Sequence, residues 1–301
     1  MAKTKQLEFE ASKKPANMLQ LFWKELKHDK IAFSAFVLLV LILVGVYIGS
    51  PIINSQMDVM HNNLLMANRS PEQTGTLLGT DGNGRYVAPL LFVAARTSLN
   101  IGLVVTALSF VIGLGLGLIS GFYGGKLDNM IMRFVDTWMM LPFLMVTIAI
   151  ISILNERTMV MFIWLLTMFT WMFRARVIRA AALQQKNLDY IHASKTLGTK
   201  NSVIILRELL PNIVDVVVAN FVITLAASIG LETGLSLLGF GLGIDTPSLG
   251  TMLQSALNPV DLQFRQWTWA PALILVVVIM LCINFAGNVL QRVADPKQRL
   301  T

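Results

Sequence analysis

The chain has 301 residues, of which 55% are hydrophobic and only 14% are charged. Soluble domains contain about 45–50% apolar and about 25% charged residues, so this composition excludes an ordinary soluble protein and predicts an integral membrane protein. The formal net charge of +7 would also suit a nucleic-acid-binding protein, but the distribution of the basic residues along the chain explains the excess better. The single cysteine, Cys282, lies in an apolar run, so a disulfide framework is excluded.

Six apolar segments of the chain are candidates for membrane spans. The first, Ile31–Ile53, has 23 residues without a charge, whereas a spanning helix needs about 20. It follows a basic segment in which residues 19–27 are expected to form an interfacial amphipathic helix. The other five segments are Ser98–Phe122, Phe134–Leu154, Met159–Phe173, Ile213–Leu231 and Ala270–Leu290. The third contains Pro142, which predicts a kink, and the fourth is expected to continue as a helix to Leu183.

The segments between the spans complete the predicted organisation. Polar loops at 54–97 and 244–268 are expected to cover the outer face, and a glycine-rich stretch at 234–243 is interpreted as a re-entrant piece. The predicted parts are a basic N-terminal segment (1–30), a first transmembrane helix (31–53), an extracytoplasmic loop (54–97), a five-helix core (98–290) that includes a cytoplasmic loop at 186–212, and a cytoplasmic tail (291–301). The stretch 124–133 is interpreted as a short polar link before the third span.

Three glycines at every fourth position of the second span form a small-residue face: Gly113, Gly117 and Gly121. Such a face lets another helix approach closely in lipid. We interpret it as helix packing within one subunit rather than as a self-association motif.

The positions of the basic residues predict the orientation in the membrane. With six spans both termini lie on the same side, and 19 of the 24 Lys and Arg residues then fall on that face. Positively charged residues accumulate in cytoplasmic loops. Both termini and the loop between the fourth and fifth spans are therefore placed in the cytoplasm.

The chain offers no set of side chains suited to catalysis or metal binding. Its three histidines, His28, His61 and His192, lie on different segments, with no carboxylate or cysteine at ligand spacing. The run Gly121-Phe-Tyr-Gly-Gly-Lys lacks the spacing of a phosphate-binding loop. We therefore expect no metal site and no nucleotide bound through such a loop, so any energy source must be a partner protein or an ion gradient.

Acidic residues within spans are typical of proton or ion relays. Asp136, Asp215 and Glu232 all lie near span ends, where each is expected to reach an interface. We interpret Asp136 as the partner of Arg133 or of another basic neighbour. For Glu232, a buried hydrogen-bonding role and a position lining a cavity both remain open.

The cytoplasmic loop at Asp189–Asn212 is expected to be folded on the membrane surface. It contains two short helix-like runs, and neither is long or apolar enough to cross a bilayer. Gly198 permits the positive φ that ends a helix sharply, and Pro211 fixes the path into the fifth span. The first run is expected to present a small surface for a soluble partner, formed by Ile191, Ala193, Ser194 and Leu197.

The spacing of this loop also follows a known pattern. The segment reads His192-Ala193-Ser194, three residues, Gly198, nine residues, and then Glu208-Leu209-Leu210-Pro211. It resembles the "EAA" coupling loop of ABC-transporter permeases, which reads Glu-Ala-Ala, three residues, Gly, nine residues and hydrophobic-x-Leu-Pro. His192, Ser194 and Glu208 depart from the residue types of that family. The resemblance implies a set of ATPase-coupling residues: Ile191, His192, Ala193, Ser194, Leu197, Gly198 and Pro211.

A second set of motifs narrows the resemblance. The motifs are Leu78-Gly-Thr-Asp-Gly-Asn-Gly-Arg85, Gly121-Phe-Tyr-Gly-Gly, Met132-Arg133-x-x-Asp136, Leu141-Pro142, Leu231-Glu232, Leu235-Ser-Leu-Leu-Gly-Phe-Gly241 and Asp295-Pro296. Together they are similar to the "C" permease of dipeptide and oligopeptide importers, with Tyr86 where an Asp is common. The resemblance implies that the extracytoplasmic loop at 54–97 contacts an external binding protein. Four residues are assigned to this binding-protein contact loop: Gly79, Thr80, Asp81 and Arg85.

The resemblance implies the type I ABC importer permease fold, an all-α membrane protein with six transmembrane helices in the bacterial cytoplasmic membrane. It implies a non-enzymatic permease subunit that couples ATP hydrolysis to the import of oligopeptides or dipeptides. The implied partners are a homologous second permease, one or two cytoplasmic ATPases that bind ATP and Mg, an extracytoplasmic peptide-binding protein and membrane lipid, but not nucleic acid. A permease for a non-peptide solute such as a nickel chelate, and an ion-coupled secondary transporter, remain as alternatives.

Overall fold

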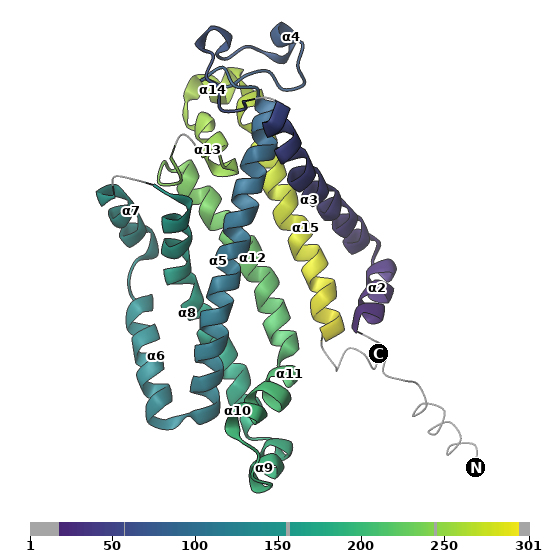
Figure 1. Ribbon diagram of the computed structural model, residues 1–301, viewed down its shortest axis with the longest axis vertical. Coiled ribbons are helices and arrows are strands. Elements are labelled where there is room, and N and C mark those ends of the chain that lie inside the picture. The colour runs from purple at the N-terminus through teal and green to yellow at the C-terminus, as the bar shows by residue number, and fades with distance from the viewer. Residues whose placement is uncertain (1–17, 57, 155–156, 244–245, 295–301) are drawn as a thin grey trace, which may run out of the picture.

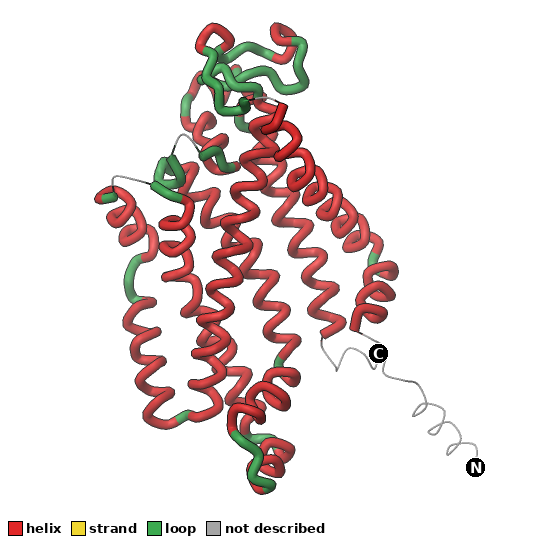
Figure 2. The backbone as a smooth tube through the Cα atoms, viewed as in Figure 1, coloured by secondary structure: helices red, strands yellow, loops and turns green. Residues whose placement is uncertain are grey.

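The chain folds as a bundle of long helices (Figures 1 and 2). The computed structural model describes residues 18–56, 58–154, 157–243 and 246–294. Most of the predicted basic N-terminal segment and the motif Asp295-Pro296 therefore lie outside the described residues. Among the described residues, β-pairing is limited to one isolated bridge between Thr80 and Tyr86. By length and composition, five helices could cross a membrane, and a bent helix pair brings the number to six when it is counted as one span. The prediction of an all-α membrane protein with six spans is therefore confirmed.

The five long helices run side by side between the two ends of the molecule (Figure 1). They are α3 (Lys30–Gln56), α5 (Val87–Tyr123), α8 (Met159–Lys186), α12 (Val214–Leu237) and α15 (Ala270–Ala294). A helix pairs its interior backbone N–H and C=O groups within one segment, as hydrocarbon requires. α5 has 37 residues, or about 55 Å at 1.5 Å per residue, so it is longer than the roughly 30 Å hydrocarbon core.

The glycine face of α5 packs against α8 within the same chain. A Cβ atom added at Gly117 would lie 2.7 Å from the carbonyl oxygen of Ala175, and Cβ atoms at Gly113 and Gly121 would come equally close to the backbone of α8. Only glycine permits two helix backbones to approach this closely. The structure thus places all three glycines at an intrachain helix crossing.

Two further glycines allow α12 to pack closely on both sides. Gly102 of α5 lies against Ile229, and Gly287 of α15 lies against Val222. A Cβ at either glycine would overlap the α12 side chain. α12 is therefore held between α5 and α15.

The third span is divided into two helices, α6 (Gly125–Met139) and α7 (Phe143–Ile153), which are bent by 74°. Pro142 precedes α7 as its N-cap residue, and proline removes a backbone donor and disfavours helical geometry before it. The kink predicted at Pro142 is confirmed. The prediction of a polar link at 124–133 is wrong, since α6 begins at Gly125 and buries Asp128 and Met132 on its packed face.

Two polar segments form the outer end of the molecule. The first contains η1 (Leu64–Met66) and α4 (Pro71–Thr74), and the second contains α13 (Leu249–Leu253), η3 (Gln254–Leu257), α14 (Pro259–Phe264) and η4 (Gln266–Thr268). We refer to residues 57–86 as the outer loop and to residues 248–268 as the outer segment. The re-entrant interpretation of 234–243 is wrong for its first residues, because α12 continues to Leu237 before the chain turns at Gly239.

At the opposite end, α2 (Met18–His28) confirms the predicted amphipathic helix. Leu26 of α2 is buried in a cluster with Ala32 of α3 and Val289 of α15. Arg292 forms a 2.7 Å ion pair with Asp29, between α2 and α3. The hydrogen bond from Arg292 holds the pKa of Asp29 below its ordinary value.

Candidate functional site

The predicted cytoplasmic loop is a compact helical unit at one end of the bundle, opposite the outer loop (Figure 1). We refer to residues 186–212 as the coupling loop. It contains α9 (Asp189–Thr196), α10 (Asn201–Ile204), a π-helical turn (Ile205–Leu209) and α11 (Leu210–Asn212), and it leads directly into α12.

A glycine ends α9. Gly198 has a φ of 78°, its N–H bonds the carbonyl of Lys195, and the N–H of Thr199 bonds the carbonyl of Ser194. This pair of bonds is a Schellman motif, and glycine adopts the required left-handed conformation without steric cost. The sharp helix end predicted at Gly198 is therefore present.

The coupling loop is anchored to α5 and α8 by a small apolar core. Ile191, Ile204 and Leu209 are fully buried, in one cluster with Leu118 and Phe122 of α5 and with three residues of α8. The predicted exposure of Ile191 is wrong, because this side chain faces inward and fixes α9 to the bundle. These buried apolar contacts attach the loop to α5 and α8.

Ser194 and Glu208, two of the residues that depart from the family pattern, are hydrogen-bonded to each other. The hydroxyl of Ser194 donates a 2.8 Å hydrogen bond to Oε1 of Glu208, which lies in the π-helical turn. Sequence reasoning treated these residues separately, and the fixed spacing of the motif was the signal that could have paired them. Nearby, burial raises the pKa of Tyr190, and the negative charge of Glu208 adds to this effect. The bond ties α9 to the helical run that enters α12.

The outward face of α9 is small and basic. His192, Ala193 and Lys195 are exposed, and Leu197 at the tip is 85% exposed. The ammonium group of Lys195 also lies 4.8 Å from the ring centroid of Phe122. Pro211 is exposed at the start of the short helix before α12. The coupling loop is therefore packed against the bundle on its buried side, and on its outward side one apolar side chain, that of Leu197, projects from it.

The predicted outer-loop residues form its internal framework. The Asp81 carboxylate accepts hydrogen bonds from the backbone N–H groups of Asn83 and Arg85, and it pairs with the Arg85 side chain at 2.8 Å. The Thr80 carbonyl accepts a bond from the indole of Trp267, in the outer segment. Gly79 has a φ of 64°, and an added Cβ there would overlap backbone at Arg69. These residues hold the shape of the loop and its attachment to the outer segment.

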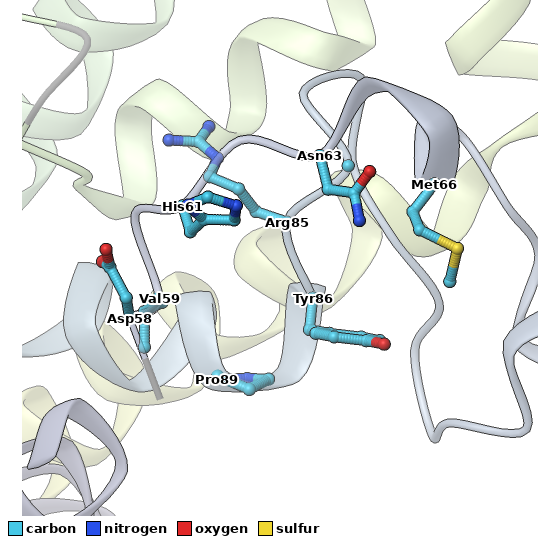
Figure 3. A pocket seen from close by; sticks show the side chains of 9 residues that line it. Asp58, Val59, His61, Asn63, Met66, Arg85, Tyr86 and Pro89 are labelled. Atoms are coloured by element: carbon cyan, nitrogen blue, oxygen red, sulfur yellow. The ribbon is translucent and has the colours of Figure 1, made fainter. Parts of the chain in front are cut away.

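A pocket of about 340 Å³ lies beside this framework. Figure 3 shows Asp58, His61 and Asn63 of the outer loop lining it, together with Tyr86, the residue that precedes α5, and Pro89 in the first turn of α5. Elsewhere on the outer loop, three leucines are exposed: Leu64, Leu65 and Leu77. The outer loop therefore has an exposed apolar part, formed by these leucines, and a buried polar part around Thr80 and Asp81 that holds its shape.

The charged residues singled out in the spans have defined partners. Asp136 of α6 pairs with Arg176 of α8, and both side chains are about half exposed. Sequence reasoning missed Asp128, which is buried and binds Arg179 of α8 and Ser120 of α5.

Glu232 does not reach a membrane interface, although its position near a span end predicts that it does. Its side chain is 0% exposed, so that prediction is wrong, and the carboxylate is bonded by hydroxyl groups of Ser236 and Thr233. Of the two roles left open, the buried hydrogen-bonding role is the one that the geometry supports. Among the described residues, no group of three or more His, Cys, Asp or Glu side chains could hold a metal ion.

The chain is also similar to known proteins. Residues 113–300 match the family described as "Binding-protein-dependent transport system inner membrane component". The oligopeptide transport system permease protein OppC of Lactococcus lactis subsp. cremoris (strain SK11) is 41% identical over 289 residues, 95% of this chain and 98% of that protein. The dipeptide transport system permease protein DppC of Bacillus subtilis (strain 168) is 32% identical over 98% of this chain and 91% of that protein.

A solved structure is also similar to the chain. The MetNI methionine ABC transporter, in an inward-facing conformation, matches with a TM-score of 0.56 and 23% identity, over 68% of this chain and 96% of that one. This likeness concerns the fold alone, the type I importer permease fold. The chain belongs to the family of inner-membrane components of binding-protein-dependent transport systems.

Proposed function

We propose that this chain is a permease subunit of an ATP-driven, binding-protein-dependent importer of peptides. The observation that carries the proposal is the position of α9, a small helix with an exposed tip on a buried base, at the start of the segment that enters α12. The relatives named for oligopeptide and dipeptide transport support a peptide as the solute.

The coupling loop would transmit the movement of a cytoplasmic ATPase to the helices. Leu197 is suited to an apolar groove on the ATPase, because burying one leucine contributes about 1.5–3 kcal/mol. Lys195, Lys200 and Arg207 are exposed around it and favour an acidic rim on that partner. The buried contacts of Ile191 and the bond between Ser194 and Glu208 would pass a push on α9 to α12 and α8. ATP and Mg would be bound by the ATPase rather than by this chain.

A second, homologous permease would supply the other wall of the pathway. The exposed ion pair between Asp136 and Arg176 supports this arrangement, because ionised side chains on spans rarely face lipid. A surface that carries such a pair suits contact with protein or with a water-filled path.

An external binding protein would deliver the peptide to the outer face. The exposed leucines Leu64, Leu65 and Leu77 are suited to contact it, since exposed apolar groups often mark interaction sites. The Asp81 framework would hold this surface in place without touching the partner itself. Deletion of 62–73 should therefore abolish association with the binding protein, and unchanged association and uptake would contradict this contact.

The test is purification of the tagged chain from native membranes, with partners identified by mass spectrometry and peptide uptake measured in cells. We expect a second permease, one or two ATPases and a peptide-binding protein. Gly198→Trp should insert normally and abolish uptake, because its side chain would occupy the ATPase contact. Gly198→Ala is the matched control: nothing lies within 4 Å of its added Cβ, so it bears only the left-handed backbone strain of about 1–2 kcal/mol. Recovery of the chain alone, or normal uptake by Gly198→Trp, would contradict the proposal.

A further inference from the structure

Glu232 joins three parts of the chain that are far apart in sequence. It lies on α12 and is 0% exposed. Ser236 of the same helix donates to its carboxylate at 2.8 Å, and the hydroxyls of Ser98 on α5 and Ser248 on the outer segment lie close enough to interact with it. Four hydroxyl groups, including that of Thr233 at 3.4 Å, thus converge on one buried carboxylate. Removing an acceptor of this kind leaves several buried donors without partners.

The same hydroxyls continue the network into the outer segment. Ser98 accepts a 3.0 Å bond from the backbone N–H of Leu249, and Ser248 accepts a 3.2 Å bond from that of Thr251. Both N–H groups belong to the first turn of α13. The backbone N–H groups of α13 therefore bond to two serine hydroxyls that also face the Glu232 carboxylate of α12.

Close backbone packing reinforces this attachment. Gly250 of α13 lies against Ser236 and Thr233 of α12, where an added Cβ would overlap both. The Gln254 side chain donates a bond to the carbonyl of Ser236. At its other end, the outer segment contacts the outer loop through the bond from Trp267 to the carbonyl of Thr80.

α12 connects this network to the coupling loop. It runs as one helix without proline from Val214, just after the coupling loop, to Leu237, beside the outer segment. Its 24 residues span about 36 Å. α5 and α15 hold it through the close contacts at Gly102 and Gly287. A displacement of the coupling loop therefore reaches the outer face along one rigid element.

We propose that Glu232 is the positioning residue that makes the outer segment move with α12, so that ATPase movement at the coupling loop changes access at the outer face. This inference rests on the proposed function, because it assigns a role within the ATP-driven cycle. Without the carboxylate, the packing at Gly250 and the bond from Gln254 remain, but they do not suffice to make the outer segment follow α12. ATP hydrolysis then continues without solute import.

The test uses the full complex, reconstituted in proteoliposomes with its ATPases and binding protein. A cysteine introduced at Ser255, which lines a pocket of about 290 Å³ between the outer loop and the outer segment, is labelled with an impermeant maleimide in the nucleotide-free and the ATP-trapped state. The native Cys282 is buried and provides the background in the chain without the added cysteine. ATP hydrolysis and peptide uptake are measured alongside, in variants without the added cysteine. Asn220→Ala is the matched control on α12, because the Asn220 side chain bonds only to the carbonyl of Val216 in its own helix.

With native Glu232, we expect the labelling rate to differ between the two states. In Glu232→Ala the difference in labelling rate between the two states should disappear. Peptide uptake should fall by about tenfold or more, as expected when hydrogen bonds to a buried charged acceptor are lost. ATP hydrolysis should stay within about twofold of the native rate. Glu232→Gln, which keeps one acceptor oxygen, should lie between. Labelling that does not depend on nucleotide with native Glu232, or that still depends on it in Glu232→Ala, would overturn the inference.

Two further outcomes are decided by the same experiment. If Glu232→Ala does not assemble, Ser236→Ala removes a single donor and should reduce both uptake and the labelling difference; no effect of either kind overturns the inference. If the native complex imports no peptide, the proposed solute fails, but the labelling comparison still decides the role of Glu232.

Discussion

The glycine face of α5 can be tested with a single methyl group. A Cβ at Gly117 would lie 2.7 Å from the carbonyl oxygen of Ala175 and 2.8 Å from Cβ of Ile178, whereas ordinary contact begins at 3.4 Å. The two helices must therefore separate by roughly 0.6–0.7 Å at this point, and overpacking of this kind costs about 1–3 kcal/mol. We expect Gly117→Ala to lower the free energy of unfolding by that amount, and Gly117→Leu to lower it further.

The matched control lies two residues away on the same helix. Gly115 has no atom within 4 Å of its added Cβ, and alanine is favoured over glycine in a helix by about 1 kcal/mol. Gly115→Ala should therefore be neutral or stabilising. Thermal denaturation of the purified protein in detergent, followed by size-exclusion chromatography, compares the two variants. Equal midpoints for Gly115→Ala and Gly117→Ala would refute the account of this helix crossing.

Three other substitutions test the coupling loop and the outer loop. Leu197→Asp should lower recovery of the ATPase in a pull-down by about tenfold, as loss of one buried leucine predicts, and undiminished recovery would show that the tip makes no contact. Gly84→Ala should distort the outer loop, because φ is 76° and the added Cβ would overlap the carbonyl of Asn63; an unchanged rate of limited proteolysis there would argue against it. Asp81→Asn removes the ion pair with Arg85 and should destabilise the same loop by about 1–3 kcal/mol, seen as faster cleavage at the same sites.

The sequence was sufficient for features that depend on local chemistry. Uninterrupted apolar length predicts a span, because hydrocarbon admits only segments that pair their own backbone. Gly198 and Pro142 predict a helix end and a kink, since each residue type restricts its own backbone in a known way. These are the features that the structure reproduces.

Other features could not be predicted because they depend on partners distant in sequence. In α9, an eight-residue helix, the pattern does not show which face packs, so the burial of Ile191 in the cluster with α5 and α8 was missed. The carboxylate of Glu232 was placed near an interface, but its hydroxyl partners include Ser98 and Ser248, which only the folded chain brings together. The bond between Ser194 and Glu208 was missed for the same reason, since it joins α9 to a π-helical turn that sequence alone did not predict.

The central claim is that this chain forms part of an ATP-driven peptide importer. The most direct test is uptake of a labelled peptide by proteoliposomes that contain the purified complex, with the binding protein outside and ATP inside. The account predicts accumulation that requires hydrolysable ATP, requires the binding protein and is lost with Gly198→Trp. Accumulation driven by an ion gradient without ATP, or equal uptake by the Gly198→Trp complex, would contradict it.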